Sequence, residues 1–372
     1  MRQLLYLLQK EFIQIFRDKF LGKVIFIIPI VQILILAPAI TFEVKNLKMA
    51  IVDNDNSVSS RELINKFGSS PFYTIVAQTY SPDVAYDLLG KDKVDVIVNI
   101  SNGFSDDLTK FNSADVQVIV NAVNGSAAQL AAGYTSGVIL DYNKQILTKT
   151  YNQDLARLET ININHRFWYN PLLNYYDYMV PGILVILVTA IGLLLSGLNL
   201  VKEKEIGTIE QINVSPIKKY QFITAKLIPF LLIGIVDLAI GLVVSKLVFG
   251  IQFNGSMLLL LMFTTIYLIA VLGLGLFISS FASTQQQYLF SVFAIIMIYV
   301  LMSGIFTPFN SMPEWAKIIS YVVNPSCYFV KVNRAIMLKG SGFNDLIPEF
   351  SALSFLAVFY FSIAIARFRK TT

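Results

Sequence analysis

The long apolar stretches of this chain constrain its fold more than any other feature. Five stretches of nineteen or more mainly apolar residues, and a sixth near the C-terminus, each have the length that crosses a hydrocarbon core of about 30 Å. Only 14% of the residues are charged and the mean hydropathy is +0.62, which excludes a cytosolic enzyme, a nucleic-acid-binding protein and a disordered chain. We expect an α-helical integral membrane protein with six transmembrane helices, at residues 24–42, 178–201, 227–249, 256–281, 288–306 and 346–366.

The positive charges predict how these spans are oriented. Thirteen Lys and Arg residues lie before the first span, in the loop 202–226 and at the C-terminus, whereas the shorter connections on the other face carry four. Short cytoplasmic loops are enriched in Lys and Arg, so both termini and the loop 202–226 should be cytoplasmic. Residues 43–177 are then extracytoplasmic, and their eleven Lys and Arg count little because long domains translocate largely regardless of charge.

Residues 1–23 are expected to form an amphipathic helix in the inner membrane interface. Charged residues interrupt this segment, which excludes an ordinary signal peptide. A cytosolic amphipathic helix packed on another protein is the alternative, and both hold if the helix enters the membrane beside a partner. The apolar residues recur at three-to-four spacing at Leu4, Leu5, Leu8, Phe12, Ile15 and Phe16.

Residues 43–177 differ sharply in composition and contain fifteen of the 24 acidic residues. We expect an inserted α/β domain between the first and second spans, because short β-branched runs alternate with helical segments. A long helix from 125 to about 158 could serve as a stalk on the membrane. The expected strands are 48–53, 94–100 and 116–121, and the expected shorter helices are 57–67, 81–90 and 103–111.

The sequence lacks the residues for a cofactor, a metal site or catalysis. No glycine-rich loop followed by Lys and Ser or Thr is present, so the chain has no P-loop for a nucleotide triphosphate. Cys327 is the only cysteine and His165 the only histidine, which excludes an internal disulfide and a Cys/His zinc site. Asp53, Asp55 and Asn56 lack the glycine and closing glutamate of a calcium loop and indicate a polar turn.

Asp237 lies near the centre of the third span. A charged residue there costs roughly 2.5–3.5 kcal/mol on insertion scales, which the apolar residues of the span outweigh. The carboxyl group is either functional or a protonated group bonded to a neighbouring helix. Small residues at Gly192, Ser196, Gly273 and Gly275 favour close helix packing.

The cytoplasmic loop contains the most informative soluble stretch, residues 203–216. Gly207 and Thr208 precede Ile209, Ile212 and Val214, which predicts a short amphipathic helix along the membrane surface. Such a helix could dock into a groove on a cytosolic partner, or its aliphatic side chains could contact lipid.

Residues 203–216, with Ala225 to Pro229, resemble the signature of ABC-2 type permeases, the membrane subunits of bacterial ABC exporters. Three further segments agree in order: Val52 to Arg61, Trp168 to Gly182 and Asn324 to Gly340. The chain is most similar to the multidrug-efflux-like branch, which has a large extracytoplasmic domain. It departs from the family pattern at Ile206, often a polar residue, and at Asn213, usually an aliphatic one.

The resemblance implies that two permease subunits pair and that each binds a separate ATP-binding subunit. Closure of the ATP-binding subunits would push the short helix of the loop and tilt the second and third spans. Residues 307–345 would form short helices that enter the outer leaflet and close the exit, with Pro313, Asn324 and Pro325 as gate residues. The implied contacts with the ATP-binding subunit are the N-terminal helix and Glu203, Glu205, Gly207, Thr208, Glu210 and Pro216.

The sequence therefore predicts a permease subunit in the bacterial inner membrane that exports a hydrophobic or amphipathic, drug-like or lipid-like substrate. Homodimer and heterodimer remain alternatives, and a periplasmic adaptor is a further candidate partner, with membrane lipids around the spans. A rival hypothesis is a mechanical transmitter that moves no substrate and uses ATP hydrolysis inside to drive an exterior partner. A membrane-embedded enzyme would need a cluster of acids, histidines or metal ligands that the sequence does not offer.

Overall fold

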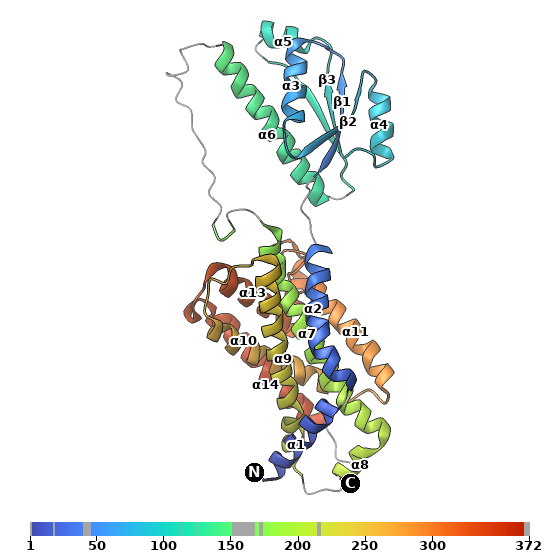
Figure 1. Ribbon diagram of the computed structural model, residues 1–372, viewed down its shortest axis with the longest axis vertical. Coiled ribbons are helices and arrows are strands. Elements are labelled where there is room, and N and C mark those ends of the chain that lie inside the picture. Colours follow the sequence, from blue (N-terminus) through green and yellow to red (C-terminus); the bar gives the residue numbers. More distant parts are fainter. Residues whose placement is uncertain are drawn as a thin grey trace. The chain divides into compact units, whose positions relative to one another are not determined.

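The chain divides into two compact units, Met1–Thr41 with Arg166–Thr372, and Phe42–His165. The first unit is helical and the second contains a β-sheet covered by helices (Figure 1). The computed structural model describes residues 2–17, 19–39, 46–111, 113–123, 125–150, 168–170, 174–213 and 217–367.

The helical unit begins with α1 (Arg2–Arg17) and α2 (Lys19–Ala39) and continues after the sheet-containing unit. The segment between α11 (Gln285–Leu301) and α14 (Ile347–Arg367) consists of short helices, which include a π-helical stretch at Ala335–Lys339. The later helices are α7 (Tyr175–Ile206), α8 (Thr208–Asn213), α9 (Lys219–Phe249), α10 (Met257–Ser279), α11 (Gln285–Leu301), η2 (Phe309–Ser311), α12 (Glu314–Val323), α13 (Pro325–Arg334), η3 (Ala335–Lys339), η4 (Phe343–Leu346) and α14 (Ile347–Arg367).

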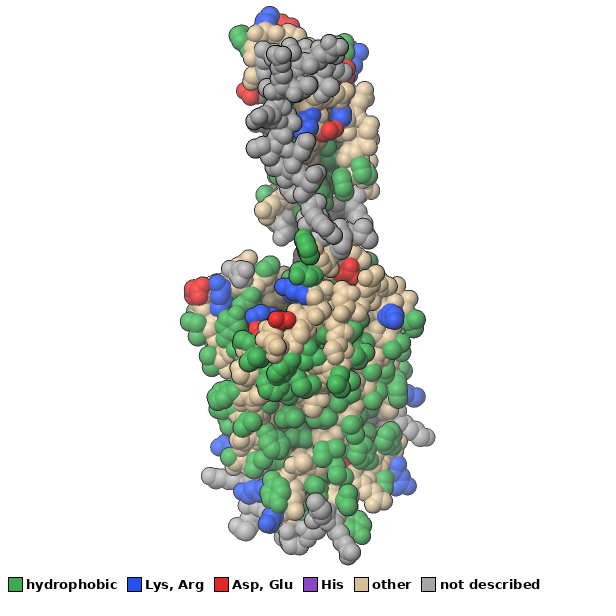
Figure 2. All heavy atoms as spheres, turned by 90° about the vertical axis from the view of Figure 1, so that its left-hand side faces the viewer, with side chains coloured by type: hydrophobic (Ala, Val, Ile, Leu, Met, Phe, Trp, Pro, Cys, Tyr) green, Lys and Arg blue, Asp and Glu red, His purple; other side chains and the backbone are tan. Residues whose placement is uncertain are grey.

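Four helices in the described residues are long and apolar enough to cross a membrane: Tyr175–Ile206, Lys219–Phe249, Met257–Ser279 and Phe343–Arg367. The prediction of a membrane-spanning helical protein is confirmed to that extent. Two further apolar helices, Ile25–Ala39 and Gln285–Leu301, are shorter. Helix α11 ends before the expected boundary at 306 because the chain turns after Leu301 and Gly304 adopts a φ of +83°. On the face shown in Figure 2, hydrophobic side chains cover most of the helical unit and Lys and Arg gather toward its ends.

Helix α7 is the centre of the helical unit, since α2, α9, α10, α11 and α13 all pack against it. Small residues allow the close approach of α10. A Cβ added to Gly192 would lie 2.9 Å from Val271, and one added to Gly275 would lie 2.2 Å from Ser196 Oγ. Any larger residue at these glycines would push the two helices apart.

Helix α1 packs against α9 with part of its apolar surface. Glu11 and Ile15 are buried, whereas Leu5 and Phe16 are 64% and 81% exposed. The apolar pattern placed Leu5 and Phe16 on the same side as Ile15. The helix thus has apolar residues on two sides, one within the bundle and one left free, as an interfacial helix requires.

The second unit is a four-stranded sheet in the order β2-β1-β3-β4. Strand β1 (Leu47–Asp53) pairs in parallel with β2 (Tyr73–Thr79) and β3 (Val96–Ile100), and β3 pairs antiparallel with β4 (Val116–Val120). Strand β2 was missed by the sequence analysis. Its residues Tyr73 and Ile75 pack on one face of the sheet and Ala77 on the other, because the register shifts between Met49 and Ala50.

Helices cover both faces of this sheet. Side chains of α3 (Val58–Gly68), α5 (Phe104–Phe111) and α6 (Gly125–Thr150) pack with Met49, Ile51 and Val98 on one face. Helix α4 (Pro82–Gly90) packs on the other face with Ala50, Val52 and Ile97. Helix α6 is part of the core of this unit, with Ala131 and Tyr142 buried. Its expected continuation to 158 lies outside the described residues.

Candidate functional site at the end of α7

The last two turns of α7 lead directly into α8, the short helix that the sequence predicts. Gly207 ends α7 with a φ of +81°, a left-handed conformation that glycine adopts without a steric penalty. Its N–H donates to the Lys204 carbonyl at 3.1 Å, and the hydroxyl of Thr208 donates to the Glu203 carbonyl at 3.2 Å. The turn thus fixes the direction in which α8 leaves the bundle.

Five polar residues from three helices meet just before this turn, and we call them the ion cluster: Lys10 and Glu11 on α1, Asn199 and Glu203 on α7, and Lys226 on α9. Lys10 Nζ lies 2.5 Å from Glu203 Oε1 and 3.0 Å from Glu11 Oε1. Lys226 Nζ lies 3.0 Å from Glu203 Oε2, an ion contact outside hydrogen-bond geometry, and 3.3 Å from Glu11 Oε1. Lys226 also donates a hydrogen bond to Asn199 Oδ1.

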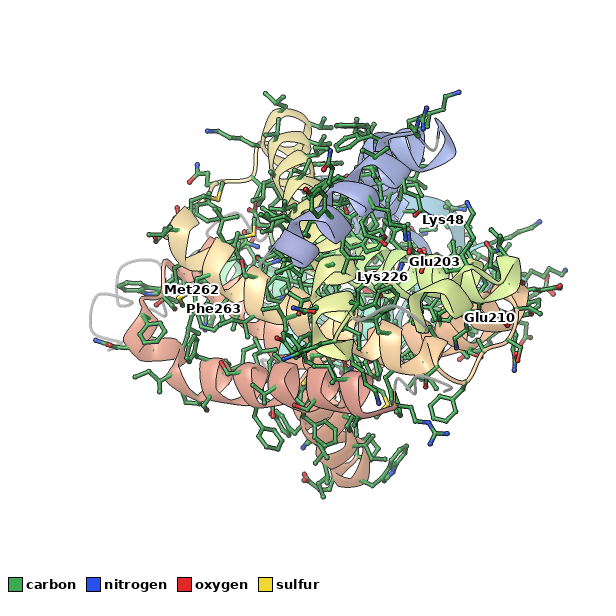
Figure 3. The ribbon with its side chains drawn as sticks, turned by 90° about the horizontal axis from the view of Figure 1, so that it is seen from below. Lys48, Glu203, Glu210, Lys226, Met262 and Phe263 are labelled. Atoms are coloured by element: carbon green, nitrogen blue, oxygen red, sulfur yellow. The ribbon has the colours of Figure 1, made fainter. Side chains whose placement is uncertain are left out.

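The ion cluster is buried and has balanced charge. Glu11 and Lys226 are each 1% exposed and Glu203 is 4% exposed, whereas Lys10 reaches solvent. Two lysines and two glutamates compensate one another, which offsets the large cost of removing each charge from water. In Figure 3, Glu203 and Lys226 lie close together, and Glu210 lies further out on α8. The cluster therefore joins α1 and α9 to the end of α7.

The two residues that follow Glu203 contact other helices. Lys204 Nζ donates to the Ser279 carbonyl at 2.7 Å, at the end of α10. Glu205 Oε1 accepts a hydrogen bond from the N–H of Gln285 at 2.8 Å, at the start of α11. Three consecutive residues of α7 thus contact four different helices.

The structure brings most of the predicted contact residues to this end of the bundle, but not all of them to the surface. Glu203 is buried in the ion cluster, so its carboxylate is not presented to a partner as the sequence analysis expected. Helices α7 and α9 extend into the expected loop 202–226. The connection between them is therefore shorter than expected and contains α8. Glu205 and Glu210 are exposed, together with Ile206 at 66%. Pro216 lies outside the described residues.

Sequence analysis missed Lys10, Glu11 and Lys226 as a functional group. A signal was present in α1, because Glu11 falls on the stripe of Leu4, Leu8 and Ile15 that faces the bundle. An acid at helical spacing among apolar residues indicates a buried partner. The spacing does not show which lysine pairs with Glu11, since Lys226 is 215 residues away in the sequence.

Asp237 lies on α9 but outside the ion cluster. Eleven residues separate it from Lys226, which is about 16 Å along a helix. Its side chain is 0% exposed, and neither carboxylate oxygen has a hydrogen-bond partner among the residues that the structure describes. The site has the apolar character of a helix packing face, with Gly234 and Gly241 one turn away on either side.

The predicted gate residues lie in the α12–α13 segment. Pro313 precedes α12 as its N-cap, and Pro325 is the first residue of α13. Asn324 joins the two helices: its side chain accepts a hydrogen bond from the Ser326 N–H and donates one to the Tyr299 carbonyl, both at 2.9 Å. This segment is therefore tied to the end of α11 by hydrogen bonds, which include one from Ser320 Oγ to the Met302 carbonyl at 3.0 Å.

The described residues contain no group of three or more His, Cys, Asp or Glu side chains that could hold a metal ion. The carboxylates of the 53–56 turn bind backbone N–H groups instead. Asp53 Oδ1 accepts from the N–H groups of Asp55 and Asn56, and Asp55 accepts from the N–H groups of Gly103 and Ser105.

Comparison with known proteins gives a consistent result over nearly the whole chain. The family model described as ABC-2 family transporter protein matches residues 23–366. The chain is 29% identical to the probable multidrug ABC transporter permease YbhR of Escherichia coli (strain K12), over 98% of this chain and 97% of that protein. It is 26% identical to the probable multidrug ABC transporter permease YbhS of the same organism, over 89% and 87% of the two chains. It is 28% identical to the E. coli inner membrane transport permease YhhJ, over 87% and 85%.

Proposed function

Since this chain belongs to the ABC-2 transporter family and is an integral membrane permease rather than an enzyme, we propose that it forms the export path of an ABC transporter. With a second permease subunit, identical or related, it moves a hydrophobic or amphipathic substrate out of the bacterial cell. The multidrug names of the relatives YbhR and YbhS support a drug-like substrate, and lipid-like compounds share the same chemistry.

A separate ATP-binding subunit, in two copies per complex, supplies the energy in this proposal. Permeases of this family work with such subunits, and the sequence has no P-loop of its own. The observation that carries the proposal is the end of α7, where a turn fixed by Gly207 presents the exposed Glu210 on α8 beside the buried ion cluster. A partner that pushes α8 would move α1, α7 and α9 together.

The proposed topology has six spans in the inner membrane and both termini in the cytoplasm. The four long helices and the shorter apolar helices α2 and α11 supply the six crossings. The excess of Lys and Arg at the termini and around α8 supports the cytoplasmic side for this end. Residues 43–177 are then extracytoplasmic.

The transport cycle would use the ion cluster as a joint and the α12–α13 segment as the outer gate. Closure of the ATP-binding subunits displaces α8 and α1, and the cluster keeps α9 aligned with α7 as both tilt. Pro313, Asn324 and Pro325 delimit the gate helices, because each stands at a helix start or junction. Asp237 lies in the middle of α9, so a tilt of this helix would also move its carboxyl group.

Substitution on the exposed face of α8 tests this proposal. Glu210→Arg should prevent co-purification of the ATP-binding subunit and abolish nucleotide-dependent uptake of ethidium into inverted vesicles, while the permease still inserts. Glu314→Arg is the matched control, since it makes the same charge change on an exposed residue of α12 and should leave the complex intact. Unchanged co-purification of the Glu210→Arg variant would remove α8 from the contact.

A mechanical transmitter is the alternative function, and the folded α/β unit is the observation that favours it. That unit carries an open groove of about 470 Å³ beside α6, where the rings of Phe72 and Tyr134 stack at 4.3 Å. A periplasmic adaptor or another exterior partner could bind there. Unchanged efflux of every hydrophobic dye in cells lacking the chain, together with an altered envelope, would favour the transmitter.

A further inference from the structure

Lys204 and Glu205 hold the connection between α10 and α11 from both sides. Lys204 Nζ donates to the carbonyls of Ser279 at 2.7 Å, Ser280 at 3.3 Å and Ala282 at 3.4 Å. Glu205 accepts hydrogen bonds from the backbone N–H and the side-chain amide of Gln285, the first residue of α11. Two neighbouring residues of α7 therefore bind the end of one helix and the beginning of the next.

The charges suit the helix ends that they contact. The last carbonyls of a helix lack intrahelical partners and carry partial negative charge, whereas the first N–H groups carry partial positive charge. Lys204 is placed at the negative end of α10 and Glu205 at the positive end of α11. We call these two residues and their partners the α7 clamp. The clamp makes the α10–α11 turn follow any movement of the end of α7.

Tyr288 adds a second attachment one turn further along α11. Its side chain is 0% exposed, its hydroxyl donates a hydrogen bond to the Leu193 carbonyl of α7, and its ring lies where a Cβ of Gly197 would be. The next residues of α11 are mostly turned away from the protein. The large apolar residues exposed there are Leu289, Phe290, Phe293, Met297, Ile298 and Leu301.

The other end of α11 is attached to the α12–α13 segment. The Tyr299 carbonyl accepts a hydrogen bond from the side chain of Asn324, and the Tyr299 hydroxyl donates to the Val323 carbonyl, both at 2.9 Å. Tyr360 on α14 donates to the same Val323 carbonyl at 2.6 Å. Helix α11 therefore has polar attachments at its two ends and a largely free apolar surface between them.

We propose that α11 is a relay helix that transmits the displacement of α8 and the end of α7 to the α12–α13 segment, through the α7 clamp at one end and Asn324 at the other. Lys204, Glu205 and Tyr288 are positioning residues in this relay and contact no substrate. The inference rests on the proposed function, because it assumes that a partner moves α8.

The relay is tested with two single-cysteine reporters in a Cys327→Ser background, which leaves no other cysteine. Ile206→Cys reports on the end of α7 and Ile318→Cys on α12, where both side chains are more than 60% exposed. The full complex with its ATP-binding subunit is reconstituted in liposomes, and bimane fluorescence is compared without nucleotide and after trapping with ATP and vanadate. In the complex with an intact clamp, both reporters should change, with a shift of the emission maximum of several nanometres.

Loss of the clamp should reduce the response of the reporter on α12 but not that of the reporter on α7. In Lys204→Met/Glu205→Ala the change at Ile206→Cys should remain while the change at Ile318→Cys falls at least threefold. Tyr288→Phe, which keeps the ring and removes its hydrogen bond, should reduce the α12 response in part. The charge-preserving variant Lys204→Arg/Glu205→Asp should keep the full response of the α12 reporter. Lys219→Met is the control for loss of a cation at the same end of the bundle and should also keep it.

Each result decides a separate point. A full response of α12 without the clamp would overturn the relay. A response at α7 but none at α12 in the intact complex would also overturn it and leave the proposed coupling through α8 standing. If neither reporter responds in the intact complex with the ATP-binding subunit attached, the proposed coupling itself is wrong, and the relay with it. Equal thermal stability and co-purification of all variants would exclude misfolding as the cause.

Discussion

Lys226 on α9 and Glu11 on α1 are 215 residues apart in the chain, yet Lys226 Nζ lies 3.3 Å from Glu11 Oε1 and both side chains are 1% exposed. Such a pair stabilises one arrangement of the N-terminal helix, because neither charge finds water or another partner if the helix slides. Glu203 closes the arrangement from α7. The ion cluster therefore makes α1 a fixed part of the bundle instead of a loose interfacial arm.

Removing one charge from the cluster should destabilise the protein strongly. Lys226→Met leaves Glu11 and Glu203 with Lys10 alone, and an uncompensated buried charge costs about 3–5 kcal/mol. Denaturant or thermal unfolding in detergent measures this loss. Lys317→Met is the control, since its pair with Glu314 is exposed and should contribute less than about 1 kcal/mol.

The double variant Lys226→Met/Glu203→Gln should lose less stability than the sum of the two single variants, because removal of both charges leaves no orphan ion between them. Additive losses would show that the two residues do not interact as the 3.0 Å contact implies.

The contribution of Lys10 should disappear at high pH. Burial lowers the pKa of Lys10, but the hydrogen bond and charge of Glu203 and the charge of Glu11 outweigh this effect and raise the pKa above its ordinary value of 10.5. A folded pKa above the unfolded one gives stability that is complete below the unfolded pKa, about 10.4, and is lost as the pH rises through the folded pKa.

The measurement compares the melting temperatures of the wild type and Lys10→Met between about pH 8 and pH 11.5. The gap between them should be constant up to about pH 10 and then narrow. A gap that widens with pH would contradict the sign of the shift.

The long helices were predictable from the sequence because each is a local pattern of apolar residues. The same holds for the turn into α8, since Gly207 followed by Thr208 is a local signal for a helix end and a new helix start. Strand β2 was missed because apolar and polar residues alternate only weakly along its seven positions. Local patterns therefore predict most helices and strands, but they do not show which side chains contact one another in the fold.

The partners inside the bundle depend on tertiary contacts that no spacing encodes. Glu203 reads as a loop acid in sequence, and its burial follows only once α1 and α9 are packed on α7. The apolar spacing of α1 also does not show which of its apolar residues is buried, since Leu5 and Ile15 are equally apolar and only the fold decides between them. The clamp formed by Lys204 and Glu205 likewise needs the α10–α11 turn to be in place.

Gly207 should tolerate only residues that accept its left-handed conformation. Gly207→Val forces a β-branched residue to a φ of +81° and should cost roughly 1–3 kcal/mol of local strain, which α8 relieves by changing direction. Insertion should be unaffected while substrate-stimulated ATPase activity of the assembled complex falls severalfold. Gly207→Asn is the matched control, because asparagine adopts this region more readily. Equal stimulation of both variants would show that the direction of α8 is unimportant.

Asp237→Leu should stabilise the protein. A buried carboxyl group without a hydrogen-bond partner costs about 1–3 kcal/mol relative to an apolar residue of similar size, so the substitution should raise the unfolding free energy by about that amount. Thermal unfolding in detergent shows whether the substitution stabilises or destabilises the protein. Efflux is measured on the same variant, and loss of efflux with gained stability would assign Asp237 a functional role. A loss of stability would instead reveal a polar contact in the assembled transporter.

Gly197 and Tyr288 fit together so closely that a single methyl group should separate α7 from α11. A Cβ on Gly197 would lie 2.2 Å from the Tyr288 ring, a distance that the two helices cannot absorb without moving apart. Gly197→Ala should therefore destabilise the protein by about 1–3 kcal/mol, although alanine is the better helix former. Gly133→Ala in α6 is the control, since its added Cβ meets nothing within 4 Å, and it should be neutral or stabilising.

Removing the ring should abolish the cost of that methyl group. In the Tyr288→Ala background, which is itself destabilised by about 3–5 kcal/mol, Gly197→Ala should add little or even stabilise through helix propensity. The coupling energy from the double-mutant cycle, measured by unfolding in detergent, should be about 1–3 kcal/mol. A double-mutant cycle with no coupling energy would mean that the Tyr288 ring does not pack against Gly197.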